Sequence, residues 1–228
     1  MAEKASLKET IVESFSPLYP SPVVSLFLFG KSAIDPEGKD LPPTVGIVLE
    51  KSSISEIRLV KDVVEKLVKK GASFPFVFTR EFVETSLDSF PLEFLEFQSY
   101  HSMLLGESPF SKRTPDVRHV RLHCEREIKG KSLHLKSAIL NLKDPKKLRD
   151  VLFVSREDLS RISIGLLVLK GTNPPAMPDD VIPEMARLYG VDRSLVMKIV
   201  KGDVALSETE AVFESYVTML DNLSINIE

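Results

Sequence analysis

The sequence has little cysteine and little net charge, and both shortages limit what the protein can be. Its 228 residues include one cysteine, Cys124, so an internal disulfide is excluded. Cys124 lies in a helical pattern among apolar neighbours, without an obvious base and acid beside it, which favours a core residue over a nucleophile. The 30 basic and 33 acidic residues give a formal charge of −3, so there is no strong signal for nucleic-acid binding, and any polyanion site must be local.

Long apolar runs are also lacking. The longest strongly apolar run covers residues 23–29, includes Ser25, and is far shorter than the ~20 residues that a membrane-spanning helix needs. The N-terminal residues are mixed in charge and have a helical period, unlike a secretory signal. We therefore expect a cytoplasmic protein without a membrane partner. Its 43% hydrophobic residues can form a sizeable core, in one large domain or in two small ones, of which we favour two.

Several common catalytic motifs are missing as well. The sequence contains no G-x-S-x-G elbow, no G-x-x-x-x-G-K-[ST] phosphate loop, no H-E-x-x-H and no paired Cys-x-x-Cys. These absences narrow the range of enzyme classes to consider.

The pattern along the chain changes near residue 112. Before it, strand and helix signals alternate, which favours a mixed sheet covered by helices on at least one face. The predicted strands are residues 22–29, 44–49, 74–78 and 90–97, and the predicted helices are an N-terminal helix, residues 54–69 and residues 80–87.

The second part of the chain reads as helical throughout. Predicted helices cover residues 116–140, 145–154, 156–169, 181–189 and 193–201, and the clearest break lies at residues 171–178. A last helix should begin at Ser207, where Glu210 completes the spacing of a capping box. We predict an α/β (α+β) protein, in which a mixed sheet with flanking helices at residues 1–111 precedes an all-helical bundle domain at residues 112–228.

Four segments together resemble a known family. Residues 24–50 read as a strand, a Gly30-Lys31-Ser32 turn, a polar loop and a second strand, followed by SLDSFPLEFLEF at 86–97, LGE at 105–107 and HCEREIKGK at 123–131. This order is similar to that of small two-domain proteins of the polymerase-beta-type nucleotidyltransferase superfamily. The resemblance implies a nucleotidyltransferase-like domain followed by a helical domain. It further implies a Gly-Ser turn that binds triphosphate, an Asp-x-Asp pair on the second strand, and a third acid from a neighbouring strand, which together hold two magnesium ions.

This sequence departs from that pattern at the residues that matter most for the reaction. Lys31 follows the glycine, and Ser32 is displaced by one position. The Asp-x-Asp positions fall on Thr44 and Gly46, neither of which can give a carboxylate to magnesium. We therefore assign no catalytic residue, no metal ligand and no cofactor, and we place the candidate nucleotide-binding site at Gly30, Lys31 and Ser32.

Two functions stay open at this point. The favoured one is a catalytically inactive pseudoenzyme of the nucleotidyltransferase fold, which binds a nucleotide or other small phosphorylated ligand, or a protein partner or a second copy of itself. The alternative is an active enzyme that needs Mg²⁺ and uses displaced carboxylates. Glu93 or Glu96 could supply the third acid, although on opposite faces of a strand each is more often a satisfied buried acid. The remaining displaced acids would come from the loop, at Asp35, Glu37 or Asp40, where turn formation is the commoner role.

The predicted helix at residues 116–140 and the residues just before it form the most basic stretch of the chain. It could hold a polyanion, or it could be a solvated face with pairs such as Glu125 with Lys129 and Glu127 with Lys131, which we favour. Its basic residues are Lys112, Arg113, Arg118, Arg121, Arg126, Lys129, Lys131 and Lys136. His119 and His123 have a spacing that can chelate a metal on a helix, but no further ligands accompany them.

Overall fold

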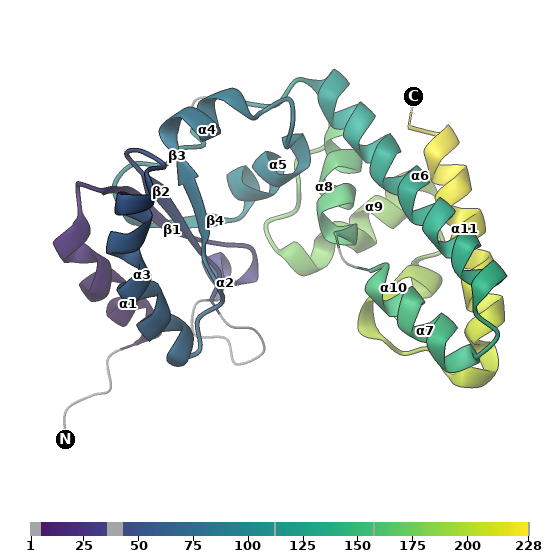
Figure 1. The fold of residues 1–228 in the computed structure, drawn as a ribbon. Coiled ribbons are helices and arrows are strands. Elements are labelled where there is room, and N and C mark those ends of the chain that lie inside the picture. The colour runs from purple at the N-terminus through teal and green to yellow at the C-terminus, as the bar shows by residue number, and fades with distance from the viewer. Residues whose placement is uncertain (1–5, 36–42, 112, 157, 228) are drawn as a thin grey trace. The chain divides into compact units, whose positions relative to one another are not determined.

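A computed structural model describes residues 6–35, 43–111, 113–156 and 158–227. The chain forms two compact units (Figure 1). The sheet unit consists of Met1–Phe90 and Glu96–Thr114, and the helical unit consists of Pro91–Leu95 and Pro115–Glu228. The protein is therefore of the mixed α+β class, with a mixed four-stranded sheet and a helical C-terminal region.

The sheet unit has the strand order β3-β2-β1-β4. Strand β1 is antiparallel to β2 and to β4, whereas β2 and β3 are parallel and are connected through a helix. The elements are α1 (Leu7–Phe15), a 3₁₀ turn (Ser16–Leu18), β1 (Val23–Phe29), α2 (Lys31–Ile34), β2 (Val45–Leu49), α3 (Ile54–Lys69), β3 (Phe76–Thr79), α4 (Arg80–Thr85), the end of α5 (Pro91–Ser99) and β4 (His101–Leu105).

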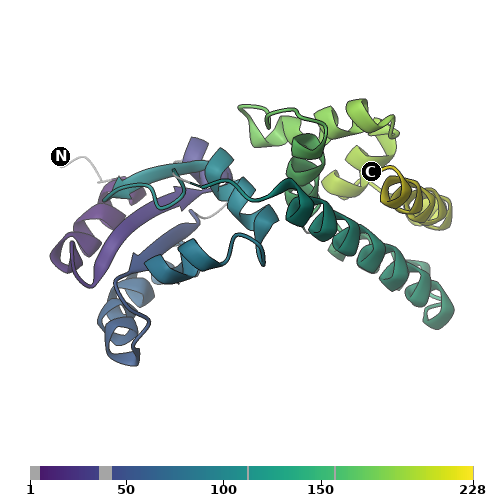
Figure 2. The same ribbon diagram turned by 90° about the horizontal axis from the view of Figure 1, so that it is seen from above.

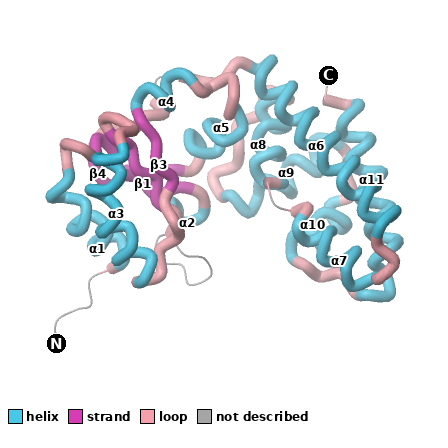
Figure 3. Tube along the Cα trace, in the orientation of Figure 1, coloured by secondary structure: helices cyan, strands magenta, loops and turns pink. Residues whose placement is uncertain are grey.

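One face of this sheet is aliphatic. Leu26 and Leu28 of β1 share it with Ile47 and Leu49 of β2, because alternate residues of a strand point to the same side. Helices α1 and α3 cover this face and contribute buried apolar residues to the same core (Figures 1 and 3). The amphipathic pattern that predicts α3 thus marks the side that packs on the sheet.

The opposite face is aromatic. Phe27 is fully buried, and its ring lies 5.0 Å from that of Phe110 and 6.3 Å from that of Phe78, measured between centroids. Phe29 lies on the same side of β1, with its ring 4.9 Å from that of Phe97 at the end of α5. Offset and edge-on pairs of this kind each contribute about 0.5–1.5 kcal/mol beyond area burial. The aromatic cluster therefore covers the opposite face of the sheet from the aliphatic core.

The prediction of a strand at residues 90–97 is wrong, because these residues form helix α5, Pro91–Ser99. Pro91 stands at the first helical position, where its missing N–H costs nothing, whereas a proline is poorly tolerated in a central strand. Glu93 and Glu96 are therefore one helical turn apart rather than on opposite strand faces. The fourth strand is instead β4, which sequence reasoning did not predict.

The predicted start of the last helix is also wrong. Helix α11 (Thr209–Ile225) follows a 3₁₀ turn at Leu206–Glu208. The carboxylate that accepts a backbone N–H here belongs to Glu208, whose Oε1 lies 3.1 Å from the amide nitrogen of Ala205, two residues earlier than the predicted pairing of Ser207 with Glu210. The reason is that the chain begins a tighter turn before the α-helix itself.

The described part of the helical unit consists of helices and loops (Figure 3). Its elements are the start of α5, α6 (Val117–Asn141), α7 (Pro145–Val154), α8 (Leu159–Leu169), a 3₁₀ turn (Pro178–Asp180), α9 (Val181–Tyr189), α10 (Arg193–Lys201), a second 3₁₀ turn and α11. The long helix α6, which is continuous in Figures 1 and 2, packs against α8 and α11. Over the described residues, none of the helices has both the length and the apolar character needed to cross a bilayer.

The core of the helical unit is closely packed where α6 meets α8. The side chain of Cys124 is fully buried, and a Cβ atom added to Gly165 would lie 2.5 Å from its Sγ and 2.6 Å from Leu92. Burial raises the pKa of the Cys124 thiol to about 12. The prediction that Cys124 is a core residue is therefore confirmed, and a thiol with so high a pKa is a poor nucleophile.

Candidate functional site

In the Gly30-Lys31-Ser32 turn, Gly30 connects the end of β1 to the four-residue helix α2, which begins with Lys31 and Ser32. Gly30 has φ 66° and ψ −145°, a conformation that is open to glycine and strained for other residues. Its amide donates to the carbonyl of Tyr100, just before β4, over 2.9 Å. The turn is therefore fixed to a neighbouring strand by its own backbone. Lys31 lies on the surface beside it.

Ser32 is buried and has a structural role. Its hydroxyl donates to the carbonyl of Phe29 over 2.8 Å and accepts from the amide of Thr44 over 3.0 Å. Thr44 in turn accepts from the amide of Phe29 over 3.2 Å. Since a serine has one hydroxyl proton, this side chain has no further donor for a phosphate. Ser32 holds the end of β1 to the start of β2.

The two positions that the resemblance matches to an Asp-x-Asp pair are Thr44, just before β2, and Gly46, in β2 on the aromatic face. Gly46 is paired with Phe27 across the sheet, and a Cβ atom added to it would lie 2.1 Å from Cζ of the Phe27 ring. A carboxylate at this position would need the aromatic cluster to move. None of the four described strands, VVSLFLF, VGIVL, FVFT and HSMLL, contains an Asp or Glu.

The acids proposed as replacements are dispersed. Glu93 belongs to the helical unit, where its Oε1 lies 3.2 Å from a guanidinium nitrogen of Arg161. Asp35 is exposed at the end of α2 in the sheet unit. Glu96 is partly buried and belongs to the same unit. Glu37 and Asp40 lie outside the described residues. Among the residues that the structure describes, no three His, Cys, Asp or Glu side chains are grouped so as to hold a metal ion.

The basic stretch on α6 is largely neutralised by ion pairs. Glu125 pairs with both Arg121 and Lys129. The pair with Lys129 is the one that the i to i+4 spacing predicts. Three further pairs are Arg118 with Asp116, Arg126 with Glu127, and Lys136 with Asp221 of α11. The solvated, ion-paired alternative therefore describes this face better than a polyanion site.

The histidines of α6 show no sign of a metal site. Burial, and next the nearby charge of Arg126, lower the pKa of His123. A lowered pKa alone would suit a metal ligand, but the described residues around His119 and His123 do not complete a set of three ligands.

A polar depression of about 530 Å³ lies in the sheet unit, and sequence reasoning missed it. His101, the first residue of β4, is paired with Phe29 of β1, so the depression begins one strand away from the Gly30 turn. The Nε2 atom of His101 lies 2.8 Å from the hydroxyl of Ser108. We call this depression the His101 pocket; its described lining is Gln98, His101, Ser108, Phe110, Ser111, Arg113 and Thr114.

The loop that carries Ser108 is fixed at its start. Gly106 has φ 73°, and a Cβ atom added to it would lie 2.3 Å from the carbonyl oxygen of Val24, so the loop runs directly against β1. The hydroxyl of Ser25 on β1 donates to the carbonyl of Glu107 over 2.8 Å. These contacts return the chain toward the start of β4, which brings Ser108 to His101.

The same loop is fixed at its far end. The side-chain amide of Gln98 donates to the carbonyl of Phe110 over 3.1 Å and to that of Arg113. One guanidinium nitrogen of Arg113 donates to the carbonyl of Glu84 over 3.0 Å. The pocket is therefore bordered by a loop with side-chain anchors at both ends. The motif LGE at 105–107 was the sequence signal that could have drawn attention to this loop.

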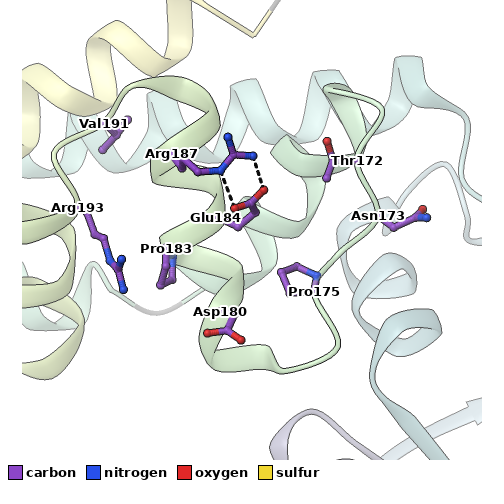
Figure 4. A pocket seen from close by; sticks show the side chains of 9 residues that line it. All are labelled: Thr172, Asn173, Pro175, Asp180, Pro183, Glu184, Arg187, Val191 and Arg193. Atoms are coloured by element: carbon purple, nitrogen blue, oxygen red, sulfur yellow. Dashed lines mark hydrogen bonds and ion pairs between the residues drawn. The ribbon is translucent and has the colours of Figure 1, made fainter.

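A second depression, of about 720 Å³, lies in the helical unit around α9 (Figure 4). Its lining mixes charges of both signs. Glu184 and Arg187, one turn apart on α9, form a two-bond ion pair with distances of 2.6 and 2.9 Å (Figure 4), and this contact lowers the pKa of Glu184. Asp180 and Arg193 lie on the same lining. Because its charges offset one another, this depression selects no ligand class.

Comparison with known proteins assigns this chain to no family. No protein-family model matches the chain, and no curated protein matches it significantly.

Proposed function

We propose that this chain is a nucleotidyltransferase-like protein that does not carry out metal-dependent nucleotidyl transfer and instead serves as a binding module for a small phosphorylated ligand. The observation that carries the proposal is the ring of Phe27, which occupies the space that a side chain at position 46 would need. A nucleotidyltransferase of the family that the sequence resembles needs a carboxylate there to hold magnesium.

The geometry of the turn supports the same proposal. Gly30 and Ser32 keep the shape of the turn through bonds to Tyr100, Phe29 and Thr44. These bonds are made within the protein, so the turn can be retained for the stability of the sheet after the chemistry has been lost. A fold that keeps its loops without its metal ligands can still bind a ligand.

The proposal is tested with the full chain, ATP and the other nucleoside triphosphates, with and without Mg²⁺. We expect no Mg²⁺-dependent release of pyrophosphate, whichever acceptor is supplied, and we expect a phosphorylated ligand to bind equally well in the presence of EDTA. Isothermal titration and a pyrophosphate assay measure the two quantities.

One outcome of the pyrophosphate assay would contradict the proposal. Release of pyrophosphate that requires Mg²⁺ and is abolished by Glu93→Gln, but not by the exposed control Glu81→Gln, would show an active enzyme with displaced carboxylates. The melting temperature of each variant would separate a lost activity from a lost fold.

A further inference from the structure

The His101 pocket differs from the other depression in the charge of its lining. None of the described residues that line it is acidic, and one of them, Arg113, carries a guanidinium cation. A ligand that enters this pocket therefore meets hydrogen-bond donors and positive charge without a competing carboxylate. Such a lining favours an anion.

Several of the polar groups in the pocket are already in use. Both donors of the Gln98 amide go to the carbonyls of Phe110 and Arg113. The hydroxyl of Ser111 donates to the carbonyl of Ser108 over 3.2 Å. These groups shape the loop and are not counted as ligands.

Other donors have no such use. One guanidinium nitrogen of Arg113 donates to the carbonyl of Glu84. The other two nitrogens of this side chain make no hydrogen bond to the described residues. The hydroxyl of Thr114 makes no hydrogen bond to the described residues either. A planar guanidinium with N–H groups available is suited to bind two oxygens of one anion, and Thr114 lies on the same lining.

The pair of Ser108 and His101 adds a further donor. The Nδ1 atom of His101 is buried and has no hydrogen-bond partner among the described residues. If Nδ1 carried the proton, a buried N–H would be left unsatisfied, which is the costlier arrangement. The proton therefore belongs on Nε2, which donates to the hydroxyl oxygen of Ser108 and leaves the Ser108 proton for a ligand.

We propose that the His101 pocket binds the phosphate group of a phosphorylated small molecule through Arg113, Thr114 and the Ser108 hydroxyl. This inference rests on the proposed function, since it gives the ligand of the binding module a place and a chemistry. Donors on three different side chains fit a tetrahedral group with three free oxygens better than a planar carboxylate. The volume of about 530 Å³ exceeds a single phosphate and has room for the organic part of the molecule.

The test is an NMR titration of the full ¹⁵N-labelled chain with inorganic phosphate, followed by AMP and by adenosine as its unphosphorylated counterpart. We expect phosphate and AMP to shift the amide signals of residues 106–114, and adenosine to bind at least about tenfold more weakly than AMP, which corresponds to the loss of charge-assisted hydrogen bonds. Acetate serves as the planar anion and should bind more weakly than phosphate.

Four variants locate the binding. Arg113→Gln and Ser108→Ala should each weaken phosphate binding, the first by about tenfold or more. The controls Arg58→Gln on α3 and Ser52→Ala in the loop before it change exposed residues of the same unit and should bind phosphate as the unchanged chain does. The ¹⁵N spectrum of each variant shows whether it is folded, and Arg113→Lys keeps the charge if Arg113→Gln does not fold.

The proposal is overturned if phosphate causes no shifts in residues 106–114, or if all four variants bind it equally. It fails separately from the proposed function. Turnover of ATP with Mg²⁺ alongside phosphate binding at Arg113 would refute the inactive module and leave the pocket in place. Binding of AMP that is insensitive to Arg113 and Ser108 would refute the pocket and leave the module in place.

Discussion

Two serines near the same end of the sheet have opposite roles. Ser32, in the turn after β1, is buried and bonds only to backbone groups, at 2.8 Å to Phe29 and 3.0 Å to Thr44. Ser108, in the loop after β4, bonds to the imidazole of His101 and lines an open depression. The first serine belongs to a motif that the sequence displays, and the second belongs to none.

The comparison shows that a motif visible in the sequence, here the Gly30-Lys31-Ser32 turn, can have a structural role in the fold. The bonds of Ser32 connect two strands and would be needed whether or not a nucleotide binds. The groups that remain available to a ligand come from a loop whose role depends on contacts far apart in sequence. The following variants test how strictly the two regions differ.

The largest effect should follow from placing a carboxylate on β2. In Gly46→Asp the new Cβ would lie 2.1 Å from the Phe27 ring and would bring a charge into the aromatic cluster. We expect a loss of at least ~3 kcal/mol in the free energy of unfolding, from overpacking and from burying an unpaired charge. Urea unfolding measures it. Gly46→Ala separates the two causes, and an unchanged urea midpoint for both variants would show that Phe27 does not block the position.

A smaller loss should follow from Gly106→Ala in the loop of the His101 pocket. The added Cβ would meet the carbonyl of Val24 at 2.3 Å, and alanine would also be strained at φ 73°. We expect a loss of about 2–3 kcal/mol, together with weaker phosphate binding. Gly190→Ala is the matched control, because Gly190 has φ 65° and no atom near its missing Cβ. If the two variants have the same urea midpoint, the close contact with β1 is not important.

The two serines themselves should differ in stability and in binding. Ser32→Ala leaves the amide of Thr44 and the carbonyl of Phe29 without a partner, so we expect a loss of about 1–2 kcal/mol and unchanged phosphate binding. Ser108→Ala should lose less than about 1 kcal/mol and should weaken phosphate binding. Thermal unfolding and the phosphate titration on both variants give the comparison. If Ser32→Ala weakened phosphate binding and Ser108→Ala did not, the ligand would bind at the Gly30 turn.

The smallest effect concerns the two arginines on either side of Pro115. Arg113 has no carboxylate partner among the residues that the structure describes, whereas Arg118 holds the pKa of Asp116 at about 2, below its usual 3.8, through a side-chain hydrogen bond. Because the folded pKa is lowered, this contact stabilises the protein above about pH 3.8, and the stabilisation is lost as the pH falls toward 2. Melting temperatures between pH 5 and pH 2 should therefore fall slightly less in Asp116→Asn than in the unchanged chain. Equal slopes would contradict this.

Helices with strong local signals could be predicted from the sequence. The bounds of α3, α7, α9 and α10 agree to the residue, because apolar spacing, terminal caps and glycine or proline stops all indicate the same ends. Residues 90–97 were predicted wrongly as a strand, since a short apolar run fits a buried strand as well as a helix. Pro91 was the local evidence against a strand.

The site could be predicted only in part. The lack of a carboxylate at Thr44 and Gly46 is visible in the sequence, but the crowding at position 46 is not, because Phe27 faces Gly46 only through the register of β1 and β2. The His101 pocket depends on a loop that folds back along β1, and no spacing in the sequence shows that His101 and Ser108 meet.

The close contact between Leu92 and Gly165 has a practical consequence for making fragments of this protein. Cutting the chain at residue 112, where the sequence pattern changes, would remove Leu92 from the helical unit to which it belongs. A fragment of residues 115–228 would then have an unfilled space beside Gly165 and Cys124, with a cost of about 2–5 kcal/mol by analogy with a buried leucine cut to alanine. An expression fragment of the helical unit should therefore carry residues 91–95 as an added segment.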